Sequence, residues 1–176
     1  MSHATSVISK SRKSLLLGTS ALVCLALAAP AMADDFVIIG SDGSTNGDID
    51  ANAINGSDTV TLGIALTTTG TNIGIETTGG TNKVTVSEAG SITTGTGNNA
   101  YGIYNYGALN TTTVSGSITT TGVGAAGIHN RGSTNTTTVS GSITTAGYGA
   151  TGIYNLGSTN TTTVSGSITT AGSSAI

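Results

Sequence analysis

The hydrophobic pattern of this chain consists of isolated valines and isoleucines among threonine, serine and glycine. Residues 111–120 read TTTVSGSITT, and the same ten letters return at 136–145 and 161–170, each copy 25 residues after the last. Apolar residues at even spacing, on a background of β-branched threonine, are typical of half-buried strands. A fixed period of this length predicts a solenoid, propeller or array of repeated units.

A second motif keeps the same period. It is Gly-Ile-Tyr-Asn at 102–105 and 152–155 and Gly-Ile-His-Asn at 127–130. A hairpin array would need a recurring two-residue turn such as Asn-Gly, and the repeat contains none. Two or three short strands with Gly or Asn corners instead fit one coil of a parallel β-helix. We therefore predict an all-β fold, a right-handed parallel β-helix (β-solenoid) of about 25-residue coils.

Alternation along a strand assigns the two faces of a coil. Val114 and Ile118 are apolar and are expected to point inward. The positions that share their face are Thr112, Gly116 and Thr120. The outward positions are Thr111, Thr113, Ser115, Ser117 and Thr119.

The same parity applies to the Gly-Ile motif. Ile128 is expected to point inward together with Asn130. Asn130 would then stack on its copies as an internal amide ladder, an arrangement that stabilises cross-β stacks. The members of this ladder are Asn105, Asn130 and Asn155. The outward columns are Tyr104, His129 and Tyr154 in one and Tyr106, Arg131 and Leu156 in the next.

The coils begin less regularly at residue 59. Four apolar residues alternate with small or polar ones there: Val60, Leu62, Ile64 and Leu66. Residues 84–92 resemble the later Val-Ser-Gly-Ser-Ile motif with two residues inserted at 88–89, which we expect in a loop. We assign 59–176 to β-solenoid repeats with an incomplete last coil. Solenoids usually end in a capping repeat, so this predicts either a longer product or self-association through the uncapped C-terminal coil.

Residues 1–33 have the layout of a secretory signal peptide. The basic residues of its n-region are Lys10, Arg12 and Lys13. An apolar run follows at 15–29, and Ala-Met-Ala precedes Asp34. The run is short for a spanning helix, which needs about 20 residues. We predict cleavage before Asp34, loss of the single cysteine Cys24 with the leader, and a secreted or cell-surface location.

Residues 34–58 are predicted to form an N-terminal cap or linker segment. The apolar run at 36–39 favours a first strand that covers the open edge of the solenoid. Segment 42–53 begins with the spacing of an EF-hand calcium loop, but Ala53 stands where that loop needs a bidentate acid. We therefore predict neither a metal site nor a cofactor.

Composition and charge narrow the classes of function. Charged residues are 7% of the chain, but the fixed period and the scarcity of Pro, Lys and Glu argue against disorder. After cleavage Lys83 and Arg131 stand against eight acidic residues, a net charge of 2 − 8 = −6, so nucleic acid is not an expected partner. His129 occupies a position that is tyrosine in neighbouring coils, and the array holds only two acids, Glu76 and Glu88. We predict no enzymatic activity.

A leader followed by Thr/Ser/Gly/Asn-rich repeats with Val-Ser-Gly-Ser-Ile and Gly-Ile-Tyr-Asn cores resembles the passenger region of Gram-negative autotransporters. The resemblance covers the leader and most of residues 54–176. It implies a β-helical passenger that a C-terminal membrane β-barrel moves to the cell surface. This chain shows no barrel pattern, so the resemblance implies an N-terminal fragment. Any association with the outer membrane is expected only through a barrel absent from this chain.

Two surfaces are candidates for binding. The first is a ridge of tyrosines beside a cation, suited to a host or surface polysaccharide or protein. Its residues are Tyr104, Tyr106, His129, Arg131 and Tyr154. The alternative is a two-column threonine face resembling those of β-solenoid ice-binding proteins. Its residues are Thr111, Thr113, Thr136, Thr138, Thr161 and Thr163.

Overall fold

The computed structural model describes residues 9–10, 35–38 and 59–176. Within these residues the chain forms strands, turns and bends. None of the described segments is a helix long and apolar enough to cross a membrane. The predicted cleavage site and the calcium-like segment 42–53 lie outside the described residues. A strand at Asp35–Ile38 falls where the sequence favoured the first strand.

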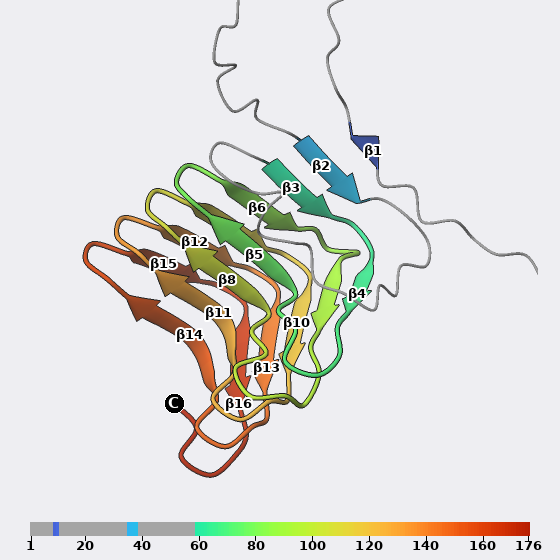
Figure 1. Ribbon diagram of the computed structural model, residues 1–176, viewed down its shortest axis with the longest axis vertical. Coiled ribbons are helices and arrows are strands. Elements are labelled where there is room, and N and C mark those ends of the chain that lie inside the picture. Colours follow the sequence, from blue (N-terminus) through green and yellow to red (C-terminus); the bar gives the residue numbers. More distant parts are fainter. Residues whose placement is uncertain (1–8, 11–34, 39–58) are drawn as a thin grey trace, which may run out of the picture.

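The described residues form three sheets, and each regular coil contributes one strand to each sheet (Figure 1). The first sheet contains β1 (Ser9–Lys10), β2 (Asp35–Ile38), β3 (Thr59–Leu62), β6 (Lys83–Val86), β9 (Thr111–Val114), β12 (Thr136–Val139) and β15 (Thr161–Val164). The second contains β4 (Ala65–Thr67), β7 (Ser91–Thr93), β10 (Ser117–Thr120), β13 (Ser142–Thr145) and β16 (Ser167–Thr170). The third contains β5 (Ile75–Thr78), β8 (Ile103–Tyr106), β11 (Ala126–Arg131) and β14 (Thr151–Leu156).

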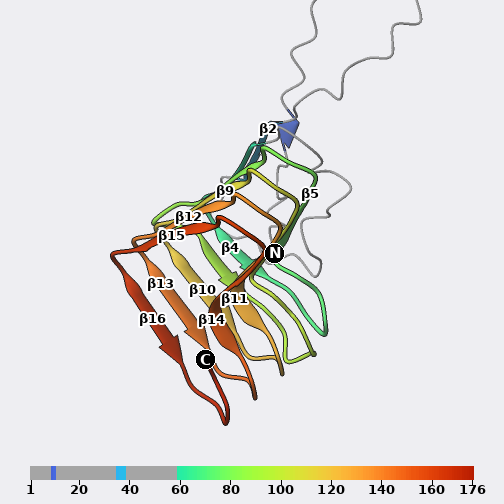
Figure 2. The same ribbon diagram turned by 90° about the vertical axis from the view of Figure 1, so that its left-hand side faces the viewer.

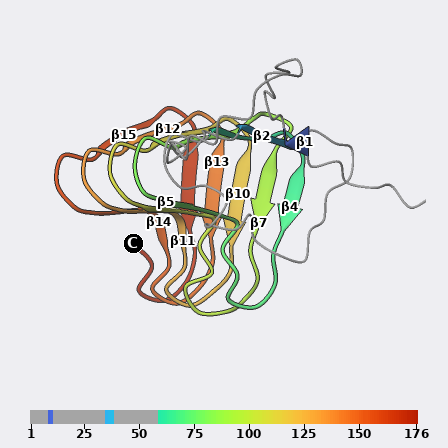
Figure 3. The same cartoon turned by 45° about the horizontal axis from the view of Figure 1, so that its top comes forward.

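Like residues pair with like across neighbouring coils. Val139 of β12 lies between its copies in β9 and β15, and Ile143 of β13 lies between its copies in β10 and β16. All pairings from β2 onward are parallel, whereas β1 pairs antiparallel with β2. Figures 2 and 3 show the strands of the second sheet side by side, in the order β16-β13-β10-β7-β4. The predicted all-β parallel β-solenoid with a 25-residue repeat is confirmed.

The core is a narrow column of apolar residues, one or two from each strand between β3 and β13. Val114 and Ile118 are fully buried, as predicted, and so are Thr112 and Thr120 on the same face. Gly116 differs from the prediction, because it lies at the corner between β9 and β10 and not inside a strand. A Cβ there would overlap carbonyl oxygens of the coil before. The repeat TTTVSGSITT is therefore two strands in two sheets.

The glycine of the Gly-Ile motif marks a close approach between two sheets. A Cβ on Gly127 of β11 would overlap the Cγ2 atom of Ile143 in β13. Gly102 stands in the same relation to Ile118, and Gly152 to Ile168. In each of these coils an isoleucine of the second sheet packs against the glycine of the Gly-Ile motif, where no Cβ would fit. This contact explains why the glycine and the isoleucine recur with the same 25-residue period.

The predicted internal amide ladder is present. Asn105 Nδ2 donates to Asn130 Oδ1 at 2.7 Å, and Asn130 Nδ2 donates to Asn155 Oδ1 at 2.7 Å. Each amide also donates to a threonine hydroxyl of the first sheet, as Asn130 does to Thr137 at 3.0 Å. The buried amides are therefore satisfied by copies of themselves, and this ties the third sheet to the first.

A second asparagine ladder runs along the corner that leads into the first sheet. The backbone N–H of Asn110 donates to Asn135 Oδ1 at 2.8 Å, and Asn135 Nδ2 donates to the carbonyl of Gly107 at 3.0 Å. Asn82 and Asn160 extend the pattern in both directions. The sequence suggested Asn corners but not this ladder. The insertion at 88–89 is where we expected it, exposed between β6 and β7.

Replacing Asn130 with alanine should lower the free energy of unfolding by about 3 kcal/mol, because it removes three hydrogen bonds, two of them to the buried Asn105 and Thr137. Urea denaturation followed by circular dichroism measures the change. Thr138→Ala, on an exposed position of the neighbouring strand β12, is the control and should change stability by less than about 0.5 kcal/mol. Equal loss in the two variants would contradict a structural role for the ladder.

Candidate functional site

The outer face of the third sheet carries the predicted ridge. His129 of β11 is in register with Tyr104 of β8 and Tyr154 of β14. Arg131 is in register with Leu156, two residues further along the same strands. The first predicted column is therefore present in full, and in the second the Tyr106 ring lies against Arg131. We use the name aromatic ridge for these residues: Tyr101, Tyr104, Tyr106, His129, Arg131 and Tyr154.

The rings of the ridge are in mutual contact. The His129 centroid lies 5.1 Å from that of Tyr104 and 4.9 Å from that of Tyr154, with tilted planes in both pairs. Tyr104 lies 6.1 Å from Tyr106 on its own strand. These separations fall within the range of favourable aromatic pairs. Parallel pairing thus turns three distant sequence positions into one continuous row of rings.

Tyr101 belongs to the same cluster and was missed by the sequence analysis. Its ring meets His129 edge-on at 4.8 Å and lies 5.4 Å from Tyr104. Tyr101 stands just before β8, where neighbouring coils carry Ala126 and Thr151. The position has no aromatic period, so the only signal was its closeness in sequence to the Gly-Ile-Tyr-Asn motif.

Arg131 is held by two tyrosines. Its Nη1 atom donates to the Tyr104 hydroxyl at 3.3 Å, and its Cζ atom lies 5.2 Å from the Tyr106 ring centroid. The hydrogen bond to Tyr104 and the nearby phenols raise the pKa of Arg131, so it stays charged. The side chain is exposed. The charged or polar groups that act on this guanidinium are the phenols of Tyr104, Tyr106 and Tyr101.

His129 points outward as predicted, but it is not the surface residue we expected. Only 8% of it is exposed, because Tyr101, Tyr104 and Tyr154 pack around the ring. Neither ring nitrogen has a hydrogen-bond partner among the described residues. Burial lowers the pKa of His129, and the positive charge of Arg131 lowers it further. His129 therefore fills the centre of the ridge as a neutral ring.

The ridge presents its chemistry through the tyrosines on either side. Tyr106 is 49% exposed and Tyr154 is 45% exposed. Together with Arg131 they offer aromatic faces, phenol hydroxyls and a guanidinium to a partner. Among the described residues no group of three or more His, Cys, Asp or Glu side chains could hold a metal. The arrangement suits binding by stacking and hydrogen bonding.

Comparison of the chain with protein-family models, with curated proteins and with solved structures gave no match.

The lowered pKa of His129 predicts a pH-dependent stability. The unfolded chain binds the proton at the usual histidine pKa of about 6.5, whereas the folded chain resists protonation. The contribution of neutral His129 is thus complete above about pH 6.5 and is lost as the pH falls towards the folded-state value. The urea midpoint of the protein should decrease between about pH 7.5 and about pH 5.

His129→Tyr is the matched variant, because tyrosine occupies this column position in both neighbouring coils. Its urea midpoint should decrease less over the same pH range. Parallel pH curves for the two proteins would show that His129 does not titrate on unfolding.

Proposed function

We propose that this chain is a secreted or cell-surface, autotransporter-like passenger segment with a structural and adhesive role and no catalytic activity. The β-solenoid supports the structural part, because a stack of hydrogen-bonded coils is a shaft that can hold a surface away from its anchor. The leader pattern at 1–33 supports export. The proposed shaft contains no cysteine, so its stability rests on strand pairing, the core column and the asparagine ladders.

The observation that carries the adhesive part is the aromatic ridge. Exposed tyrosines are favoured in recognition surfaces because a rigid ring gives a large contact area with a polar end. Tyr106 and Tyr154 are both about half exposed and are fixed by their packing against Tyr104 and His129. A preorganised surface loses little conformational entropy when it binds. The partner we propose is a host or surface polysaccharide or protein.

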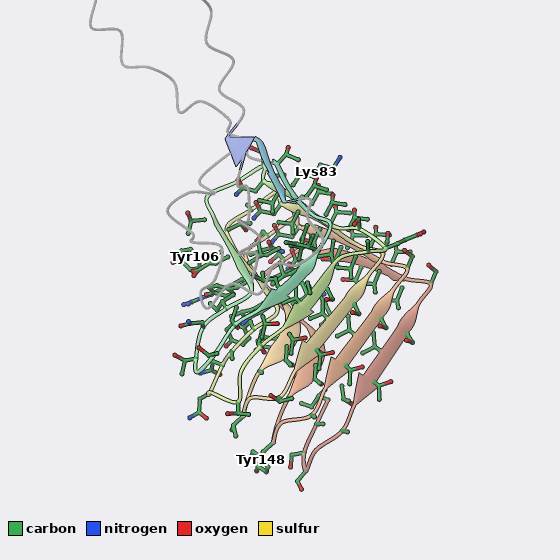
Figure 4. The ribbon with its side chains drawn as sticks, turned by 90° about the vertical axis from the view of Figure 1, so that its right-hand side faces the viewer. Lys83, Tyr106 and Tyr148 are labelled. Atoms are coloured by element: carbon green, nitrogen blue, oxygen red, sulfur yellow. The ribbon has the colours of Figure 1, made fainter. Side chains whose placement is uncertain are left out.

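Replacing Tyr106 and Tyr154 with serine in one variant should reduce adhesion of the displayed or bead-coupled protein by at least about tenfold, since each lost aromatic contact weakens binding. Adhesion to cells or to polysaccharide-coated surfaces is the measurement. Tyr148→Ser is the control, because Tyr148 is 62% exposed and lies away from the ridge (Figure 4). The adhesive role is wrong if the ridge variant adheres as well as the control.

A specific observation favours ice binding as the second candidate. The threonines of the predicted face stack in register, and one of its columns extends over five coils as Thr61, Thr85, Thr113, Thr138 and Thr163. The second sheet repeats the feature with Thr67, Thr93, Thr119, Thr144 and Thr169. Lys83 interrupts the other column of the first sheet. Such hydroxyls recur at about the 4.8 Å strand spacing.

Thermal hysteresis of the purified mature chain separates the two candidates. An ice-binding surface should give hysteresis that Thr138→Lys abolishes, because a long charged side chain breaks the flat array. An adhesive passenger should give none in either protein. Hysteresis that survives Thr138→Lys would exclude this threonine face as its source.

A further inference from the structure

Charge is distributed unevenly along the chain. Six of the eight acidic residues precede the coils, at positions 34, 35, 42, 48, 50 and 58. Beyond Glu88 the sequence contains one charged side chain, Arg131, apart from His129. The ridge therefore has a positive centre in a protein whose mature net charge is negative. A cation placed in this way attracts anions locally.

Arg131 is also oriented for a ligand. The Tyr104 hydroxyl accepts a hydrogen bond from Arg131, and the Tyr106 ring lies against the guanidinium. A guanidinium has five N–H donors in a planar fork that matches the two oxygens of a carboxylate. The remaining donors are accessible to a ligand because the side chain is exposed. An ordered fork loses less side-chain entropy on binding than a free one.

The acidic residue nearest in the same sheet is Glu76 of β5, which pairs with Tyr104. Glu76 lies two strands from Arg131 in the sheet order, and the Arg131 side chain extends over the strand between them. Arg131 is the one Lys or Arg residue in the described strands of the third sheet, so it supplies the attraction for an anion at the ridge.

We propose that the ridge binds a carboxylate-bearing sugar of an acidic polysaccharide, with Arg131 holding the carboxylate and Tyr106 and Tyr154 contacting the sugar rings. The proposal rests on the adhesive function and names its ligand class. The tyrosines account for contact with any sugar, and the guanidinium fork adds selectivity for uronic acids. One polysaccharide chain can contact both tyrosines and the cation, because Tyr106 on β8 and Tyr154 on β14 lie on either side of β11, the strand that carries Arg131.

The test compares polygalacturonate with the same polymer after methyl esterification, which removes the carboxylate charge and leaves the backbone unchanged. Isothermal titration should show wild-type protein binding the acid polymer at least about tenfold more tightly, the usual gain from a charged hydrogen bond. Arg131→Gln should remove this preference. Lys83→Gln should keep it, because Lys83 lies on the first sheet (Figure 4). Circular dichroism checks that both variants fold.

Equal binding of the two polymers by wild-type protein, or a preference that persists in Arg131→Gln, would overturn the proposal. The same experiment with Tyr106 and Tyr154 replaced by serine separates this failure from failure of the adhesive function. If the serine variant loses adhesion while Arg131→Gln keeps the preference for the acid polymer, the proposed adhesive function is supported and the proposed binding of uronic acids by Arg131 is wrong. If the serine variant adheres normally, the adhesive function itself falls.

Discussion

The structure depends on in-register parallel pairing of coils that are 25 residues apart in the regular copies. Each strand bonds only to its copies before and after, so an inward polar residue meets itself in the next coil. Asn130 illustrates the constraint, because its amide both accepts from Asn105 and donates to Asn155. A slip of one residue would turn every side chain to the opposite face. The ladder and the aliphatic column therefore select one register together.

The same pairing determines what the outer surface can become. Inward positions are enclosed by other residues on all sides, whereas outward positions contact only other outward side chains and solvent. The column of Tyr104, His129 and Tyr154 tolerates a change of residue for this reason, and the change alters its chemistry. His129 provides a buried neutral centre, while the tyrosines on either side remain accessible.

The interior could be predicted from the sequence because the 25-residue repeat and the alternation of side chains along a strand determine which residues point inward. Val114, Ile118 and Asn130 are buried as this alternation predicted. It did not predict that the chain turns at Gly116, because a two-residue corner leaves the parity of Val114 and Ile118 unchanged. Nor did it predict that Tyr101 belongs to the aromatic ridge. Its long side chain reaches from a corner to the His129 ring in the next coil. Corners carry no two-residue period, so their contacts appear only in three dimensions.

Stacking also limits where charge can stand. Two like charges in one column would be separated by about 4.8 Å and would repel by about 1 kcal/mol even in water. In the described columns Lys83 lies between threonines, and Arg131 lies beside Leu156. In a repeat of this kind aromatic rings can stack in several successive coils. A cation is favoured in a single coil, because cations stacked in successive coils repel each other. A ligand that needs both is therefore recognised along the row of rings and positioned by the single guanidinium.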